Sequence, residues 1–164
     1  MEGIFVDSLA KARKTVEKRL RQHDAIRQEV EWYKLEGTGG PGNILHKINA
    51  KGISRPTEMQ ALKEMNEVPC VEIKTGKKAS ETIRRPEAWL HIYRLVVQEF
   101  GELAVRRYNG ELYIKTCLAL HISRASYYAN KDSMLNLAVC AACQLGLVKI
   151  IDTLPGIGGY ADKC

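Results

Sequence analysis

Residues 8–36 contain no glycine or proline and carry apolar side chains at helical intervals. The apolar positions recur at steps of three, four and occasionally six residues: Leu9, Ala12, Val16, Leu20, Ile26, Val30 and Tyr33. This pattern predicts one long amphipathic helix with a narrow apolar stripe. The stripe could pack against the rest of the protein, or it could pair with a second copy as a coiled coil. A homodimer through this helix is therefore one expectation.

The basic residues of this helix do not predict a DNA contact. Lys18, Arg19, Arg21 and Arg27 are opposed by acids along the same stretch. Such a balance of charge is typical of a solvated helix surface. We therefore do not assign the helix itself to DNA.

A glycine-rich segment, GTGGPGN at residues 37–43, ends the helix and indicates a linker. A phosphate-binding loop would need a lysine and a hydroxyl residue directly after its last glycine, because these groups reach the outer phosphates and magnesium. Asn43 and Ile44 stand there instead, which argues against a nucleotide site. No cofactor is expected.

The middle of the chain predicts three further elements. Residues 53–66 indicate a helix with Pro56 at its first position. Residues 68–79 are either a short strand or hairpin or an irregular basic loop, because apolar and charged residues alternate only briefly. Residues 87–108 show a broad apolar helical face, which begins after Pro86 and which Gly101 could divide into two helices.

The charge balance favours a polyanionic partner without establishing one. The formal net charge is +6, and the surplus is concentrated in the middle of the chain. This basic cluster could meet phosphates, or it could be a solvated loop. Its members are Lys74, Lys77, Lys78, Arg84 and Arg85.

The five cysteines predict a reducing compartment. Their number is odd, and the N-terminal residues show no apolar stretch long enough for a signal peptide. A cytoplasmic protein is expected, with no membrane partner, because the longest uncharged run (133–148) is shorter than a membrane span. Cys140 and Cys143 have the spacing of a zinc pair, but they stand among small apolar residues. We interpret them as buried free thiols and expect no metal.

The segment ELYIKTCLALHISRASYYANKDSML, after Asn109 and Gly110, predicts a helix-turn-helix. Residues 112–120 form the supporting helix and residues 120–122 the turn. Ser123 is the expected N-cap of the second helix. His121 stands where glycine is usual, so it must adopt a left-handed or bridging conformation.

Two faces of the second helix differ in the residues that they carry. Tyr127 and Leu135 are expected to face inward, whereas small and basic residues are left for the outer face. Small residues permit close approach to a major groove, and arginine can pair with guanine edges or phosphate. The candidate DNA contacts are Ser123, Arg124, Ser126, Tyr128 and Lys131 on this helix, and Lys115 on the supporting helix.

The stretch ISRASYYANKDSML, with the LAVCAACQLGLV that follows, resembles the C-terminal helix-turn-helix of phage late transcription regulators of the ArpU/RinA type. That element in turn is similar to the fourth region of sigma-70 factors. ISRPTEMQALKEM resembles the Pro-Thr-Glu segment of these regulators, and the order of motifs matches over roughly residues 8–148. The resemblance implies an activator of phage or prophage late genes that binds double-stranded promoter DNA and acts through host RNA polymerase.

Two other classes of protein remain as alternatives. A phage small-terminase-like packaging subunit also combines a helix-turn-helix with long helices, although there the DNA-binding unit usually comes first. A helical interaction module that does not bind DNA is the second alternative. An enzyme is not expected, because the sequence shows no paired carboxylates, no nucleophile elbow and no nucleophile with an assignable base.

These observations together predict a mainly α chain. Its parts are an N-terminal helical arm (1–36), a linker (37–55), a helical DNA-binding domain (56–150) with its helix-turn-helix at about 111–132, and a flexible tail (151–164).

Overall fold

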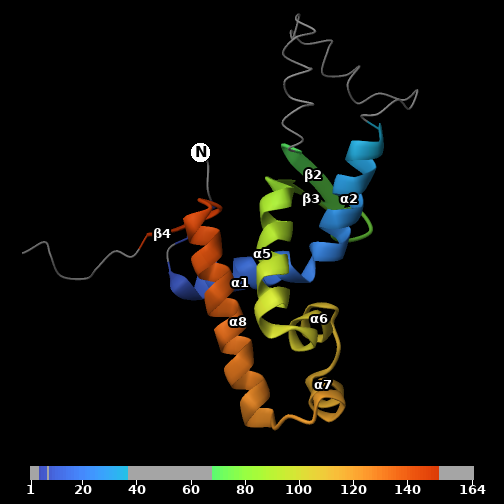
Figure 1. The fold of residues 1–164 in the computed structure, drawn as a ribbon. Coiled ribbons are helices and arrows are strands. Elements are labelled where there is room, and N and C mark those ends of the chain that lie inside the picture. The colour runs from blue at the N-terminus through green and yellow to red at the C-terminus, as the bar shows by residue number, and fades with distance from the viewer. Residues whose placement is uncertain (1–3, 7, 37–67, 152–164) are drawn as a thin grey trace, which may run out of the picture. The chain divides into compact units, whose positions relative to one another are not determined.

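The computed structural model describes residues 4–6, 8–36 and 68–151. This described part contains six helices and four short strands, which confirms the mainly helical fold (Figure 1). Three predicted segments lie outside the described residues: the linker, the helix at 53–66, and the tail from residue 152 onward. None of the described helices combines the length and the apolar character needed to cross a membrane.

The chain divides into two compact units. One unit is Arg19–Leu95, which contains α2 (His23–Glu36), a β-hairpin and most of α5 (Pro86–Phe100). The other unit combines Met1–Lys18 with Val96–Cys164 and contains the predicted helix-turn-helix. The N-terminal part of the first helix therefore belongs to the same unit as the helix-turn-helix.

The β-hairpin in the first of these units consists of β2 (Cys70–Lys74) and β3 (Ser80–Arg84), which pair antiparallel. Val71, Ile73 and Ile83 are buried, because alternate residues of a strand point to the same face and α2 packs against β2. Of the alternatives for residues 68–79, a strand is confirmed at Cys70–Lys74, whereas the second strand of the hairpin lies after the predicted segment. All members of the basic cluster are exposed on the hairpin or directly after it: Lys74, Lys77, Lys78, Arg84 and Arg85.

The prediction of a single long N-terminal helix is wrong. The helix α1 (Leu9–Arg21) ends before Gln22, and α2 begins at His23. The His23 ring stacks on Tyr93 with 3.8 Å between the ring centroids, and its Nδ1 lies 2.8 Å from the Leu20 carbonyl oxygen. A buried side chain thus engages a helical carbonyl at the break. The six-residue step in the apolar pattern falls at this break. In a continuous helix such a step would place the following apolar side chains on a different face from the preceding ones.

The predicted division at Gly101 is confirmed. The helix α5 starts at Pro86, and α6 (Glu102–Tyr108) begins directly after the glycine. Gly101 has a φ of 59°, a conformation that side chains with a Cβ adopt at a cost. A separate turn at Asn109 and Gly110, with a φ of 83° at the glycine, then leads into the helix-turn-helix.

The longest described helix, α8 (Arg124–Gln144), runs through the unit that holds the helix-turn-helix. Figure 1 shows α7 (Tyr113–Leu120) at one end of α8 and β4 (Val148–Ile150) at the other. The strand β1 (Ile4–Val6) lies beside β4. The strands β1 and β4 pair in parallel, a contact that the sequence did not predict. Buried residues of this unit come from α1, α5, α6, α8 and β4: Ala12, Val16, Val96, Leu103, Ala104, Met134, Ala138, Ala142 and Val148.

Candidate nucleic-acid interface

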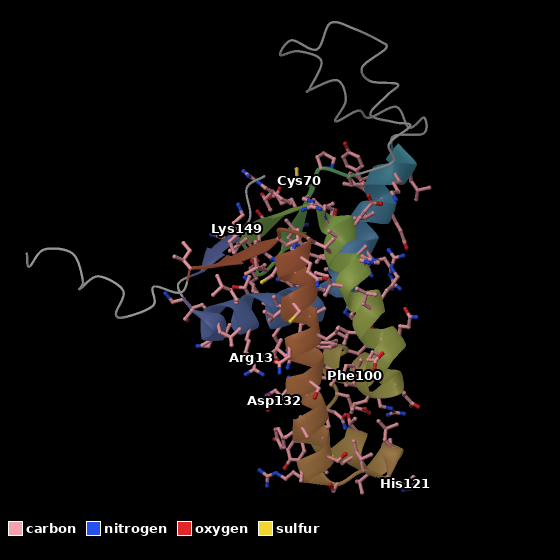
Figure 2. The ribbon with its side chains drawn as sticks, turned by 60° about the vertical axis from the view of Figure 1, so that its left-hand side comes forward. Arg13, Cys70, Phe100, His121, Asp132 and Lys149 are labelled. Carbon is pink, nitrogen blue, oxygen red and sulfur yellow. The ribbon has the colours of Figure 1, made fainter. Side chains whose placement is uncertain are left out.

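The turn of the helix-turn-helix is built around His121. This residue, labelled in Figure 2, lies at the end of α7. It has the left-handed conformation, with φ 53° and ψ 40°. Its backbone N–H and that of Ile122 both donate to the Cys117 carbonyl. A carbonyl in the last turn of a helix has no N–H partner within the helix, so these two bonds satisfy it. Of the two conformations predicted for this histidine, left-handed and bridging, the structure shows the left-handed one.

Ser123 caps the second helix as predicted. Its hydroxyl oxygen accepts a hydrogen bond from the Ser126 backbone N–H at 3.1 Å, and its carbonyl accepts one from the Tyr127 N–H at 2.9 Å. The hydroxyl therefore already serves the first turn of α8 as an acceptor. It fixes where the helix starts and, with that, which residues occupy each face.

Tyr127 is held in the interior, as predicted. Its side chain is 2% exposed, and its phenolic oxygen accepts a hydrogen bond from Arg107 Nη1 at 3.0 Å. Arg107 is also buried and pairs with Glu17 of α1. Burial lowers the pKa of Arg107, but the bond to Tyr127 and the charge of Glu17 outweigh this, so its pKa lies above the ordinary value. Three helices of this unit thus meet at one charged, hydrogen-bonded group.

A row of cations and tyrosines lies on the outer face at the start of α8. The Arg124 guanidinium carbon is 5.7 Å from the ring centroids of both Tyr113 and Tyr128, and Lys131 Nζ is 5.8 Å from the Tyr128 centroid. These distances are typical of cation–π contacts. Arg124 is exposed and Tyr128 is 38% exposed. We refer to Tyr113, Arg124, Tyr128 and Lys131 as the cation–tyrosine row.

The remaining candidates are placed differently. Ser126 is half-buried, and its carbonyl accepts a hydrogen bond from Asn130 Nδ2 at 2.9 Å. Lys115 is exposed on α7 near Glu111; the pKa of that carboxyl is lowered first by the hydrogen bond from Arg106, and Lys115 adds a smaller effect. The structure therefore brings together Arg124, Tyr128 and Lys131, whereas Lys115 acts on the Glu111 carboxyl.

Sequence reasoning missed Tyr113 as a member of this row. The tyrosine is the first residue of α7, and its contact with Arg124 depends on how the turn folds α7 against α8. A signal was present in the three tyrosines that flank the turn. Their rings cluster, with centroids of Tyr113 and Tyr128 separated by 5.8 Å.

The prediction of buried thiols at Cys140 and Cys143 is wrong. Both residues are exposed on α8, because Ala138, Ala141 and Ala142 occupy the inward positions. Partial desolvation raises the pKa of the Cys143 thiol, and the neighbouring Cys140 adds to this effect. Within the described ranges, histidine, cysteine and acidic side chains form no group of three or more that could hold a metal ion.

Comparison with protein-family models, with curated proteins and with solved structures finds no match to this chain.

Proposed function

We propose that this protein is a sequence-specific DNA-binding transcription regulator whose second helix, α8, reads the major groove with its first turns. One observation supports this most strongly. The left-handed turn at His121 and the cap at Ser123 start α8 so that Arg124, Tyr128 and Lys131 share its outer face while Tyr127 points inward. Such a division between a packed and a basic outer face is what a recognition helix requires.

The chemistry of the outer face suits a base-reading role. Arg124 presents a planar, permanently charged guanidinium that can donate two parallel hydrogen bonds to a guanine edge. Ala125 beside it is small and exposed, so it permits close approach of the helix to the groove floor. Tyr128 and Lys131, one and two helical turns further along, are suited to phosphate oxygens at the groove edge.

The proposed biological role is activation of phage or prophage late genes through host RNA polymerase. This role is proposed because the sequence resembles phage late regulators of the ArpU/RinA type. The proposal assigns no catalytic residue, metal or cofactor to the chain.

A gel-shift titration tests the proposal. The probe is the late promoter of the phage or prophage that encodes the protein, and the competitor is a random duplex of equal length. We expect wild type to prefer the promoter. Arg124→Ala should lose about 1–3 kcal/mol of that preference, because a bidentate base contact is removed. Lys131→Ala should weaken binding to both duplexes alike.

The matched control is Arg94→Ala, which removes an exposed arginine from α5. It should bind as wild type does. Equal binding of wild type to promoter and random duplex, or unchanged preference in Arg124→Ala, would contradict the assignment of α8 as the recognition helix.

A further inference from the structure

The helix α1 reaches the same surface of α8 that carries Lys131. Arg13 Nη2 of α1 lies 3.3 Å from Asp132 Oδ1 of α8, and both residues belong to one compact unit (Figure 2). Around this contact the two helices border an open hollow of about 380 Å³. Three cations line it, namely Arg13, Lys14 and Lys131.

The hollow continues the cation–tyrosine row. Lys131 belongs to both, because its ammonium group lies 5.8 Å from the Tyr128 ring and its side chain lines the hollow. Arg124, Tyr128 and Lys131 follow one another at steps of four and three residues, so they share one face of α8. A basic path therefore runs along α8 from Arg124 to Lys131 and onto Arg13 and Lys14 of α1.

The two acidic residues that line the hollow do not prevent its cations from binding an anion. Glu17 is engaged by the buried Arg107. The Arg13–Asp132 pair is at the surface, with side chains 31% and 65% exposed. An exposed ion pair of this kind stabilises a protein little, so the Arg13 guanidinium can exchange the carboxylate for a phosphate at small cost.

The charge pattern along the sequence did not assign this helix to DNA, but its position in the structure does: we propose that Arg13 and Lys14 of α1 bind the phosphate backbone of duplex DNA beside the recognition helix. This inference rests on the proposed function and names a second element that contacts the same DNA. The contact is independent of base sequence, because phosphates are the same at every step. In this arrangement Asp132 holds the Arg13 side chain at the edge of α8 and weakens binding by its own negative charge.

Fluorescence anisotropy with a labelled duplex, measured at several salt concentrations, tests the inference. Each phosphate contact contributes about 0.9 to the slope of log K against log salt concentration. We expect Arg13→Gln and Lys14→Gln each to reduce the slope by about one unit and to lower affinity roughly eightfold at about 0.1 M salt, for promoter and random duplex alike. Lys11→Gln removes the same charge from an exposed position of α1 that does not line the hollow, and it should leave the slope unchanged.

Asp132→Asn separates a phosphate contact from a merely structural ion pair. It breaks the pair with Arg13 as Arg13→Gln does, but it leaves the cation and removes a charge that repels phosphate. We expect affinity to rise. A fall in Asp132→Asn similar to that in Arg13→Gln would overturn the inference, since both changes would then act through the lost pair.

Unchanged slopes in Arg13→Gln and Lys14→Gln would also overturn it. If wild type in that experiment still prefers the promoter and Arg124→Ala still loses the preference, the proposed function stands without the α1 contact. If wild type binds no duplex at all, both proposals fail.

Discussion

Arg107 of α6 donates a hydrogen bond from Nη1 to the phenolic oxygen of Tyr127 on α8 at 3.0 Å. This bond keeps the first tyrosine of the pair in the interior, so the neighbouring Tyr128 lies on the outer face. Two adjacent tyrosines of identical chemistry thereby serve different purposes. The helical spacing turns Tyr127 inward, and a buried arginine twenty positions earlier in the chain supplies the hydrogen-bond donor for its hydroxyl.

Tyr127→Phe should destabilise the protein. The substitution removes the hydrogen-bond acceptor and leaves Arg107, a buried and charged donor, without this partner. The loss costs about 1–3 kcal/mol of unfolding free energy. Tyr128→Phe, at the exposed neighbour, should change it by less than about 0.5 kcal/mol. Urea unfolding followed by circular dichroism measures both. Equal losses in the two variants would show that the bond to Arg107 stabilises nothing.

Ser123→Ala should remove the N-cap of α8. The Ser126 N–H then loses its hydrogen-bond acceptor, and we expect a loss of about 1 kcal/mol in unfolding free energy. Ser123→Asp should retain the stability, because a carboxylate accepts the same bond. Ser133→Ala is the control, since that serine lies in the middle of α8 and donates its hydroxyl to the Ala129 carbonyl of the preceding turn. A loss at Ser133 as large as that at Ser123 would contradict the capping role.

His121→Gly and Gly101→Ala should change stability in opposite directions. Both positions have a positive φ, 53° and 59°. The left-handed conformation of His121 costs a residue with a Cβ about 1–2 kcal/mol, and the conformation of Gly101, with a ψ of −135°, costs such a residue about 1–3 kcal/mol. His121→Gly removes the conformational cost at this position. About 0.5–1 kcal/mol of that gain is lost, because glycine has greater freedom in the unfolded chain. Gly101→Ala introduces the cost, and the added Cβ itself meets no atom within 4 Å. Thermal unfolding of the two variants would contradict the explanation if both shifted in the same direction.

Acid should weaken the structure around the start of α7 through Glu111. The pKa of this carboxyl lies below its ordinary value of 4.5, because Arg106 and Thr116 donate hydrogen bonds to it. A lowered folded-state pKa means that the contribution is complete above the unfolded-state value and is lost as pH falls through the folded-state value. Stability measured from neutral pH down to below pH 4 should therefore decline less in Glu111→Gln than in wild type. Parallel pH profiles of the two proteins would exclude Glu111 as a source of acid sensitivity.

The mass of the protein in solution should distinguish the regulator from a packaging subunit. A regulator that binds DNA through one helix-turn-helix per chain is expected as a monomer or dimer, whereas packaging subunits assemble into large rings. Light scattering coupled to size-exclusion chromatography gives this mass directly. A large ring would favour the packaging alternative over the proposed function.

The sequence by itself determined the parts whose geometry depends on neighbouring residues. The cap at Ser123, the left-handed turn at His121, the break at Gly101 and the start of α5 at Pro86 were all predictable. Each rests on hydrogen bonds and backbone angles that span only a few residues. The inward position of Tyr127 followed from the same local spacing.

Only the tertiary structure decided the features that join distant segments. His23, at the break between α1 and α2, stacks on Tyr93, and Cys140 and Cys143 are exposed because alanines of α8 face the core. Tyr113 joins Arg124, and Arg13 meets Asp132, only because the helices of their unit fold together. No spacing along the chain specifies these contacts, since burial and the packing of whole helices select which side chains meet.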